Sequence, residues 1–357
     1  MSLSIGIVGL PNVGKSTLFN ALTRQSVDAA NYPFCTIDPS VGIVPVPDER
    51  LTALSGLSRS AQTIPAVVEF VDIAGLVAGA SKGEGLGNQF LSHIREVDAI
   101  AEVVRVFEDT EITHVAGRVD PLHDIGVINL ELVLADLEVV SKRLGSIEKE
   151  ARAGDKSAAA SKAALERVAQ GLEEGKLARA LTFSDEERRL LKGLNLLSLK
   201  PILYVLNSKG SAAVPEPLLE FFAASGAEYV LVDARVEEEV KDFAGEERAA
   251  FRRELGASGS NLDALITKGY ELLNLITFFT TGEKESRAWT TRRGSTAPEA
   301  GAAIHSDFQD KFIRASVISW QELVESGSCG AAREKGLVRT EGKEYIVKDG
   351  DIIEFKI

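Results

Sequence analysis

Short apolar runs separated by amphipathic segments make up most of this chain. The runs predict β-strands at residues 4–8, 41–46, 67–71, 98–104, 201–206 and 229–232. Helical periods follow two of the strands, at residues 17–22 and 89–97. Alternating strands and helices of this kind predict an α/β fold with a parallel, doubly wound sheet. Pro45 and Pro47 place the 41–46 strand at a sheet edge, because proline cannot donate a ladder hydrogen bond.

A different period begins at Ile128. Apolar residues then recur in steps of four and three, which is typical of a coiled-coil seam: Val133, Leu137, Val140, Leu144, Ile147 and Ala151. The pattern breaks at residues 153–155 and resumes at Leu165, Val168 and Leu172. We expect an antiparallel α-helical hairpin inserted into the first domain over residues 128–198. Ser184 begins a capping-box sequence, which predicts a further helix through Leu197.

Strand-like runs reappear beyond Ile276, at residues 286–290, 312–317, 344–347 and 352–355. One helical segment, residues 319–326, lies among them. This pattern predicts a separate small α+β module over residues 277–357. The first domain then covers residues 1–276.

The strongest chemical signal is a glycine-rich turn between the first strand and the first helix. It reads Gly9-Leu10-Pro11-Asn12-Val13-Gly14-Lys15-Ser16-Thr17 and fits G-x-x-x-x-G-K-[ST]. A strand, this turn and a helix N-terminus together aim backbone N–H groups at one point, which suits a polyphosphate. We expect nucleotide contacts from Gly9, Asn12, Val13, Gly14, Lys15, Ser16 and Thr17. Lys15 would contact the β- and γ-phosphates, and the Ser16 hydroxyl would bind Mg²⁺.

Asp72-Ile73-Ala74-Gly75 follows the 67–71 strand and supplies the next part of the site. Asp72 would hold Mg²⁺ through a water molecule, and the Gly75 N–H would sense the γ-phosphate. Thr36 lies in the loop after the first helix, where nucleotide switches place a threonine that closes over the metal. The predicted magnesium ligands are therefore Ser16, Thr36 and Asp72.

Leu76 occupies the position where switch GTPases often have a glutamine that orients the attacking water. Leucine cannot hydrogen-bond to water, so hydrolysis is slow or uses another group. His114, in a polar loop after the fourth strand, is the candidate for that group. A solvated loop histidine is the alternative. The predicted catalytic set is Lys15, Thr36, Gly75 and His114.

Base selection departs from the guanine-specific pattern Asn-Lys-x-Asp. The strand ending at Leu206 is followed by Asn207-Ser208-Lys209-Gly210, so the fourth position carries no acceptor. Asn207 can still face purine N7, and Ser208 and Ala234 complete the predicted base contacts. A site that hydrogen-bonds to a polar group of its ligand rejects a ligand lacking that group by a factor of roughly 10⁴–10⁵. A site without the bonding partner cannot discriminate in this way. We predict that ATP is accepted at least as well as GTP.

Composition narrows the class of partner. The formal net charge of −13 argues against a protein that coats nucleic acid, so any RNA contact needs a local basic patch. Lys284, Arg287, Arg292 and Arg293 form one candidate patch, with a solvated charged surface as the alternative. Cys35 and Cys329 predict neither a disulfide framework nor a zinc site. Because there is no leader sequence and no apolar run of membrane-spanning length, we expect a cytoplasmic protein without membrane contact.

The chain resembles the YchF subfamily of Obg-like P-loop NTPases. The segments that carry the resemblance are residues 9–17, 31–39, 72–76, 79–87 and 278–357. The resemblance implies a ubiquitin-like β-grasp module of the TGS type at the C-terminus. It also implies ATP hydrolysis with some GTP capacity, and association with the ribosome, chiefly its large subunit. Family members commonly have Asn-x-x-Glu for base selection, and Gly210 departs from that pattern.

The leading hypothesis is a slow, Mg²⁺-dependent ATPase or GTPase that switches while bound to the ribosome or ribosomal RNA, acting as a monomer. The alternative is a nucleotide-dependent binding module for RNA or protein in which turnover is incidental. A small-molecule kinase is a third hypothesis. It would need an acceptor pocket, whereas a helical hairpin and a grasp module favour macromolecular contacts.

Overall fold

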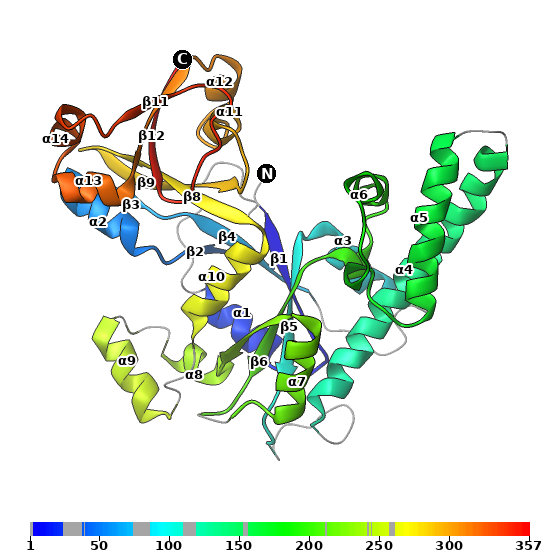
Figure 1. Cartoon of the computed structure of the whole chain (residues 1–357). Coiled ribbons are helices and arrows are strands. Elements are labelled where there is room, and N and C mark those ends of the chain that lie inside the picture. Colours follow the sequence, from blue (N-terminus) through cyan, green and yellow to red (C-terminus); the bar gives the residue numbers. More distant parts are fainter. Residues whose placement is uncertain are drawn as a thin grey trace.

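The computed structural model describes residues 3–23, 38, 40–73, 86–109, 119–152, 156–210, 213–240, 243, 245–256 and 261–357. Within these residues the chain forms two six-stranded sheets. Figure 1 shows the two sheets beside each other, with a pair of long helices extending away from the first.

The first sheet has the strand order β2-β4-β1-β5-β6-β7. Its strands are β1 (Ser4–Val8), β2 (Val41–Pro45), β4 (Val67–Asp72), β5 (Ala99–Arg105), β6 (Ile202–Asn207) and β7 (Glu228–Val232). Neighbouring strands pair in parallel, as predicted, except that β2 runs antiparallel to β4. The expectation of a wholly parallel sheet was therefore wrong at one edge. An antiparallel edge strand is common in doubly wound sheets. Such a strand forms ladder hydrogen bonds with a neighbour on one side only.

Six helices, described next, lie on this sheet or beside it, and α1, α3 and α7 connect its strands. They are α1 (Lys15–Thr23), α3 (Leu86–Glu96), α7 (Glu216–Ser225), α8 (Ala234–Glu239), α9 (Gly245–Glu254) and α10 (Leu262–Leu272). Apolar side chains of α1 and α10, such as Leu18 and Leu265, are buried with β1 and β5 in one core. This packing fixes the carboxyl ends of β1, β4, β5 and β6 at one sheet edge.

The inserted helices are α4 (Pro121–Arg152) and α5 (Lys156–Glu173). The first turns of α4 pack on the main sheet through Ile125 and Ile128. Farther along, the predicted seam residues share a second core: Val133, Val140 and Ile147 of α4 with Leu165, Val168 and Leu172 of α5. The helix thus begins seven residues before Ile128, the start that periodicity indicated, and it belongs to both cores.

The helix predicted to run from Ser184 through Leu197 is shorter than expected. Helix α6 (Asp185–Lys192) has the predicted capping box, with Ser184 and Glu187 satisfying each other's backbone N–H groups. It ends at Gly193, and Asn195 has a positive φ of 47°. The remaining residues form a separate 3₁₀ turn, η4 (Leu197–Leu199), preceded by η3 (Ala178–Ala180). A left-handed residue stops an α-helix, which explains why the prediction overran.

The second sheet has the order β11-β10-β12-β8-β9-β3. Its strands are β3 (Gln62–Ile64), β8 (Leu275–Thr281), β9 (Glu285–Arg292), β10 (Arg314–Ser319), β11 (Arg339–Glu341) and β12 (Asp351–Lys356). The strand predicted at residues 344–347 is wrong. Tyr345 N–H donates to the Gly342 carbonyl in a turn, and Ile346 makes one isolated bridge, to Thr296.

The C-terminal module is joined to the first domain through its sheet, which includes one strand from that domain. Strand β3, from the first domain, pairs in parallel with β9. Helix α2 (Glu49–Ser58) packs on the same sheet, together with α13 (Trp320–Ser326) and α14 (Cys329–Glu334). The opposite face is covered by α11 (Ala297–Gly301) and α12 (Ser306–Asp310).

An ion-paired arginine joins the two parts. The Arg50 guanidinium contacts Asp48 at 2.8 Å and Asp349 at 2.6 Å, and it lies over the Phe279 ring. Asp349 in turn accepts a hydrogen bond from the Thr277 N–H at 2.9 Å. Helix α2 and the turn before β12 are therefore held together by charge-assisted bonds.

Among the described residues, no helix combines the length and apolar character that crossing a membrane requires.

Candidate nucleotide-binding site

The glycine-rich turn lies between β1 and α1, as predicted. Two of its glycines occupy positions where a side chain would clash with neighbouring atoms. Gly14 has φ of 98°, and a Cβ on it would lie 2.2 Å from the Asn207 amide nitrogen. A Cβ on Gly9 would lie 2.6 Å from the Val103 carbonyl oxygen. Asn12 also has a positive φ, 63°. Successive residues of this kind turn their N–H groups toward one side of the loop, which is how an anion-binding loop is built.

Lys15 and Asp72 lie together at the start of this helix. Ile7 pairs with Asp72 across β1 and β4, so the carboxylate lies beside the strand that enters the loop. The buried Lys15 Nζ donates to the Leu10 carbonyl at 2.8 Å. Burial lowers the pKa of Lys15, and the charge of Asp72 partly opposes that shift. Burial likewise raises the pKa of Asp72, against the effect of Lys15. Each charge therefore stabilises the other in a partly dry site.

The donor set here fits magnesium. Ser16 lies exposed at the first turn of α1, and Asp72 is half-buried at the end of β4. Hydroxyl and carboxylate oxygens are hard ligands, and Mg²⁺ is usually held by one or two of them together with substrate phosphates. Within the described ranges no group of three or more His, Cys, Asp or Glu side chains is placed to hold a metal ion.

Asn207 links the two sides of the site. Its Nδ2 donates to the Val13 carbonyl at 2.8 Å, and its Oδ1 accepts from the Ala234 N–H at 3.1 Å. The predicted residues Val13, Asn207 and Ala234 are thus brought together by one buried amide. Because an amide nitrogen has two N–H groups, one remains for the predicted contact with purine N7.

Asp233 organises the loops on the base side. Its Oδ2 accepts from the Gly210 N–H at 2.8 Å, and its Oδ1 accepts from the Val236 N–H at 3.0 Å, capping α8. Ser208 is buried, and its N–H donates to the Val232 carbonyl at 2.9 Å. Asp233 therefore ties the loop after β6 to the start of α8 through two backbone N–H groups.

A cavity of about 690 Å³ adjoins these residues. Its lining includes Asn12, Gly14 and Thr17 from the phosphate loop and Asn207 to Gly210 from the loop after β6. Sequence reasoning missed six further lining residues: Phe107, Asp109, Val236, Glu238, Glu239 and Leu255. Phe107 and Asp109 follow β5 at the carboxyl edge of the sheet, where ligands of such folds bind, so their position was a usable signal. Leu255 follows α9 and carries no such signal.

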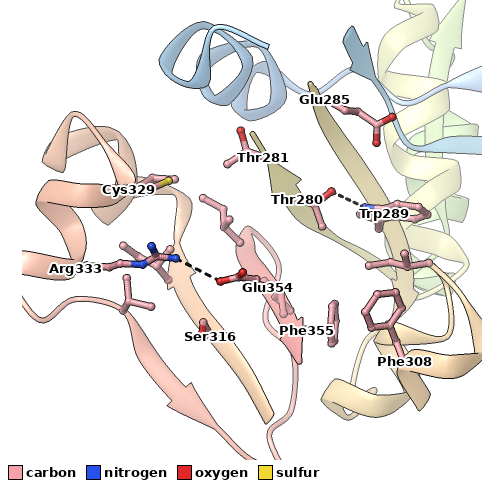
Figure 2. A pocket seen from close by; sticks show the side chains of 16 residues that line it. Thr280, Thr281, Glu285, Trp289, Phe308, Ser316, Cys329, Arg333, Glu354 and Phe355 are labelled. Carbon is pink, nitrogen blue, oxygen red and sulfur yellow. Dashed lines mark hydrogen bonds and ion pairs between the residues drawn. The ribbon is translucent and has the colours of Figure 1, made fainter. Parts of the chain in front are cut away.

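The C-terminal module holds a second cavity, of about 550 Å³, between β8, β9, β12 and α14 (Figure 2). Its lining is mostly apolar. Polar contacts there are Trp289 Nε1 donating to Thr280 at 2.9 Å and an exposed pair between Arg333 and Glu354 at 3.3 Å. It includes none of the phosphate-loop residues, so the nucleotide chemistry belongs to the first cavity.

Three predicted residues, Thr36, Gly75 and His114, lie outside the described residues, as does Leu76. Their assigned roles stay predictions.

This fold and this loop define a P-loop NTPase of the Obg-like group. A family model described as a 50S ribosome-binding GTPase matches residues 4–132, and a model named YchF-GTPase_C, described as a protein of unknown function, matches residues 275–357. The Ribosome-binding ATPase YchF of Bacillus subtilis (strain 168) is 52% identical over 363 residues, which cover 100% of this chain and 99% of the relative. The chain therefore belongs to the YchF family.

Two further comparisons agree over the full length. The Ribosome-binding ATPase YchF of Escherichia coli O157:H7 is 49% identical over 359 residues, covering 99% of each chain. The solved structure of the Schizosaccharomyces pombe YchF GTPase superposes with a TM-score of 0.89 at 39% identity, covering 99% of this chain and 98% of that one.

Proposed function

We propose that this protein is a Mg²⁺-dependent nucleoside triphosphatase that accepts ATP at least as well as GTP and acts on the ribosome, through its large subunit. The observation that carries the nucleotide part is the phosphate loop joined by Asn207 to a base loop whose fourth residue, Gly210, has no acceptor. The ribosomal part rests on relatives whose names state that they bind ribosomes. A role on the ribosome places the protein in the cytoplasm.

The reaction is in-line attack of water on the γ-phosphate. Lys15 and the loop N–H groups supply positive charge where negative charge accumulates in the transition state. Ser16 and Asp72, with Thr36, would hold Mg²⁺, which neutralises charge on the β- and γ-phosphates when bound. Because Leu76 cannot orient water, turnover is slow unless His114 does so.

The domain arrangement follows the same proposal. Residues 1–276 form the NTPase domain, residues 128–198 are its helical insertion, and residues 277–357 form a TGS module. The helical pair and the module are the two parts available for macromolecular contacts. The protein works as a monomer.

Hydrolysis assays with ATP and GTP, with and without Mg²⁺, test the catalytic part. We expect slow phosphate release from both nucleotides that chelation of Mg²⁺ abolishes. Release that persists without Mg²⁺, or no release with either nucleotide, would contradict the proposal.

The alternative function is a binding module with incidental turnover. Ribosome co-sedimentation in the presence of ADP, ATP or a non-hydrolysable ATP analogue distinguishes it from a switch. A switch gives different ribosome occupancy in ADP and in the analogue, because the two states differ at the γ-phosphate. Occupancy that is the same in all three states would favour the binding module.

A further inference from the structure

Strands β2 and β4 form one antiparallel hairpin, and the first of its two ends lies at the nucleotide site. The strands pair along the whole of β2. At this end the Asp72 N–H donates to the Ser40 carbonyl at 2.8 Å, and the Asp72 carboxylate interacts with the charge of Lys15. Thr36 and Gly75, whose roles at the γ-phosphate are predictions, precede β2 and follow β4 along the chain. Both ends of the hairpin's sequence therefore lead to the nucleotide site.

The other end of the hairpin enters the C-terminal sheet. Between β2 and β4 the chain forms α2 and β3, and β3 pairs in parallel with β9. The pairing begins one step earlier, where the Ala61 N–H donates to the Glu283 carbonyl at 2.9 Å. Figure 1 shows α2 and β3 lying beside β8 and β9. One continuous element therefore has its first end at the nucleotide site and its second end in the C-terminal module.

Polar side chains fix this second end. The Ser60 hydroxyl lies 2.7 Å from the Gly282 carbonyl oxygen and 2.7 Å from the hydroxyl of the fully buried Ser286. Arg50 adds the charged bond to Asp349 described above. Because these bonds join α2 and β3 to three segments of the module, a displacement of the hairpin must either break them or move the module's packing with it.

Trp320 lies close to this second end. It begins α13, which packs on α2. The Trp320 Cδ1 and the Arg50 Nη1 lie 2.6 Å and 3.3 Å from the position that a Cβ on Gly350 would occupy, so ring and guanidinium adjoin the same turn. The chain has two tryptophans, Trp289 and Trp320, and both belong to the C-terminal module. Neither is among the described residues that line the nucleotide cavity.

We propose that the β2–β4 hairpin couples the nucleotide site to the C-terminal module, so that the bound nucleotide changes how α2 packs against α13. A triphosphate makes contacts at the first end that a diphosphate lacks, and this differential interaction biases the hairpin between two positions. Coupling free energy is reciprocal, so a macromolecule bound to the module changes the relative affinity for the two nucleotides. The inference rests on the proposed function and deepens it by giving the route of its regulation.

The first domain reaches the C-terminal sheet by a second connection, in which α10 leads into β8. There the buried Tyr270 hydroxyl lies 3.0 Å from the Thr277 hydroxyl and 3.1 Å from the Thr290 hydroxyl. This junction offers a matched control, because Tyr270→Phe removes polar contacts between the same two parts without touching the hairpin.

The test measures tryptophan emission of the full chain carrying Trp289→Phe, so that Trp320 is the sole reporter. Indole emission depends on the packing and polarity around the ring. With Mg²⁺ and saturating ADP or non-hydrolysable ATP analogue, we expect two different emission spectra. Adding Arg50→Ala/Ser60→Ala should abolish the difference between the two nucleotides, while calorimetry shows that both still bind.

Tyr270→Phe in the same background should keep the difference. If the double variant does not fold, Ser60→Ala alone should reduce the difference, and its contacts lie at the β8–β9 turn rather than at Trp320. Identical spectra with both nucleotides would overturn the inference. A difference that survives Arg50→Ala/Ser60→Ala would also overturn it, because the signal would then reach Trp320 by another route.

Calorimetry on the parent chain separates this inference from the proposed function. Failure of the ATP analogue to bind refutes the proposed function. Binding of both nucleotides with unchanged Trp320 emission refutes only the coupling.

Discussion

Lys15 bonds to the Leu10 carbonyl of the phosphate loop and interacts with the charge of Asp72, and we propose that it also contacts the reacting phosphates. A hydrogen bond to a charged group contributes about 1.5–3 kcal/mol, so Lys15→Ala should weaken triphosphate binding by about 10- to 100-fold. Fluorescent-nucleotide titration measures this directly. Lys176→Ala is the control, because Lys176 follows α5, pairs with exposed Glu174 and does not line the nucleotide cavity. An equal loss in both variants, or none in Lys15→Ala, would refute the assigned role.

Glu102 is a fully buried carboxyl group on β5, next to Tyr204 and Arg179. Burial raises its pKa to about 8, with Asp124 adding to the shift and Arg179 opposing it. In the unfolded chain a glutamate titrates near about 4.3. The unfolded state therefore releases its proton first, and the stability from this group, complete at low pH, is lost as pH rises through the folded pKa. The free energy of unfolding should fall by up to about 1.4 kcal/mol per pH unit between the two pKa values.

Glu102→Gln should remove that part of the pH dependence, because glutamine stays neutral with nearly the same shape. Urea unfolding at several pH values between the two pKa values measures the difference between variant and wild type. Glu220→Gln, at an exposed position on α7, should leave the slope unchanged. Parallel curves for wild type and Glu102→Gln would show that the group is ionised in the folded protein.

At the residue scale, the sequence predicted those site residues whose positions depend only on their neighbours along the chain. Gly14, Lys15 and Asp72 are identified by their spacing because one loop and one strand end determine their geometry. Phe107 could have been predicted, because it follows β5 and ligands of such folds bind at the carboxyl ends of the strands. Leu255 was not, since only the packing of α9 on α8 brings it to the cavity.

Helix α2 and strand β3 are the elements that attach the C-terminal sheet. Arg50 of α2, with a side chain 24% exposed, bonds to both Asp48 and Asp349. We expect Arg50→Ala to lower the free energy of unfolding by about 1–3 kcal/mol, because Asp349 loses a close charged partner. Chemical denaturation measures the loss. Arg333→Ala breaks a pair in which the arginine is 65% exposed, and it should cost about 0–1 kcal/mol. Equal effects would show that the α2 contact is only a surface pair.

Periodicity predicted the elements that bury a continuous face. All six strands of the first sheet and the seam of α4 and α5 belong to this group. Strand β3 is three residues long and mostly exposed, and it is a strand only because β9 pairs with it. Residues 344–347 have strand composition, yet Tyr345 enters a turn. Both errors have one cause, since pairing partners far along the chain override local preference.

For the whole molecule, a net charge of −13 must be reconciled with the ribosomal partner that we propose. Arg287 and Arg292 lie on β9 and Arg293 follows it, and Arg287 lies 4.2 Å from the Trp289 ring. Reversing the three charges to glutamate should weaken ribosome co-sedimentation and flatten its dependence on salt, since fewer phosphate contacts release fewer ions. Reversal of Lys142 and Arg143 on α4 tests the insertion in the same way. Unchanged sedimentation of the β9 variant at several salt concentrations would remove this cluster from the interface.

The central claim is that the site holds a triphosphate without selecting guanine. Parallel calorimetric titration of the full chain with non-hydrolysable ATP and GTP analogues, in the presence of Mg²⁺, tests it most directly. We expect ATP to bind at least as tightly as GTP, because Gly210 has no side chain that could accept hydrogen bonds from guanine. Tight binding of GTP with strong exclusion of ATP would contradict it.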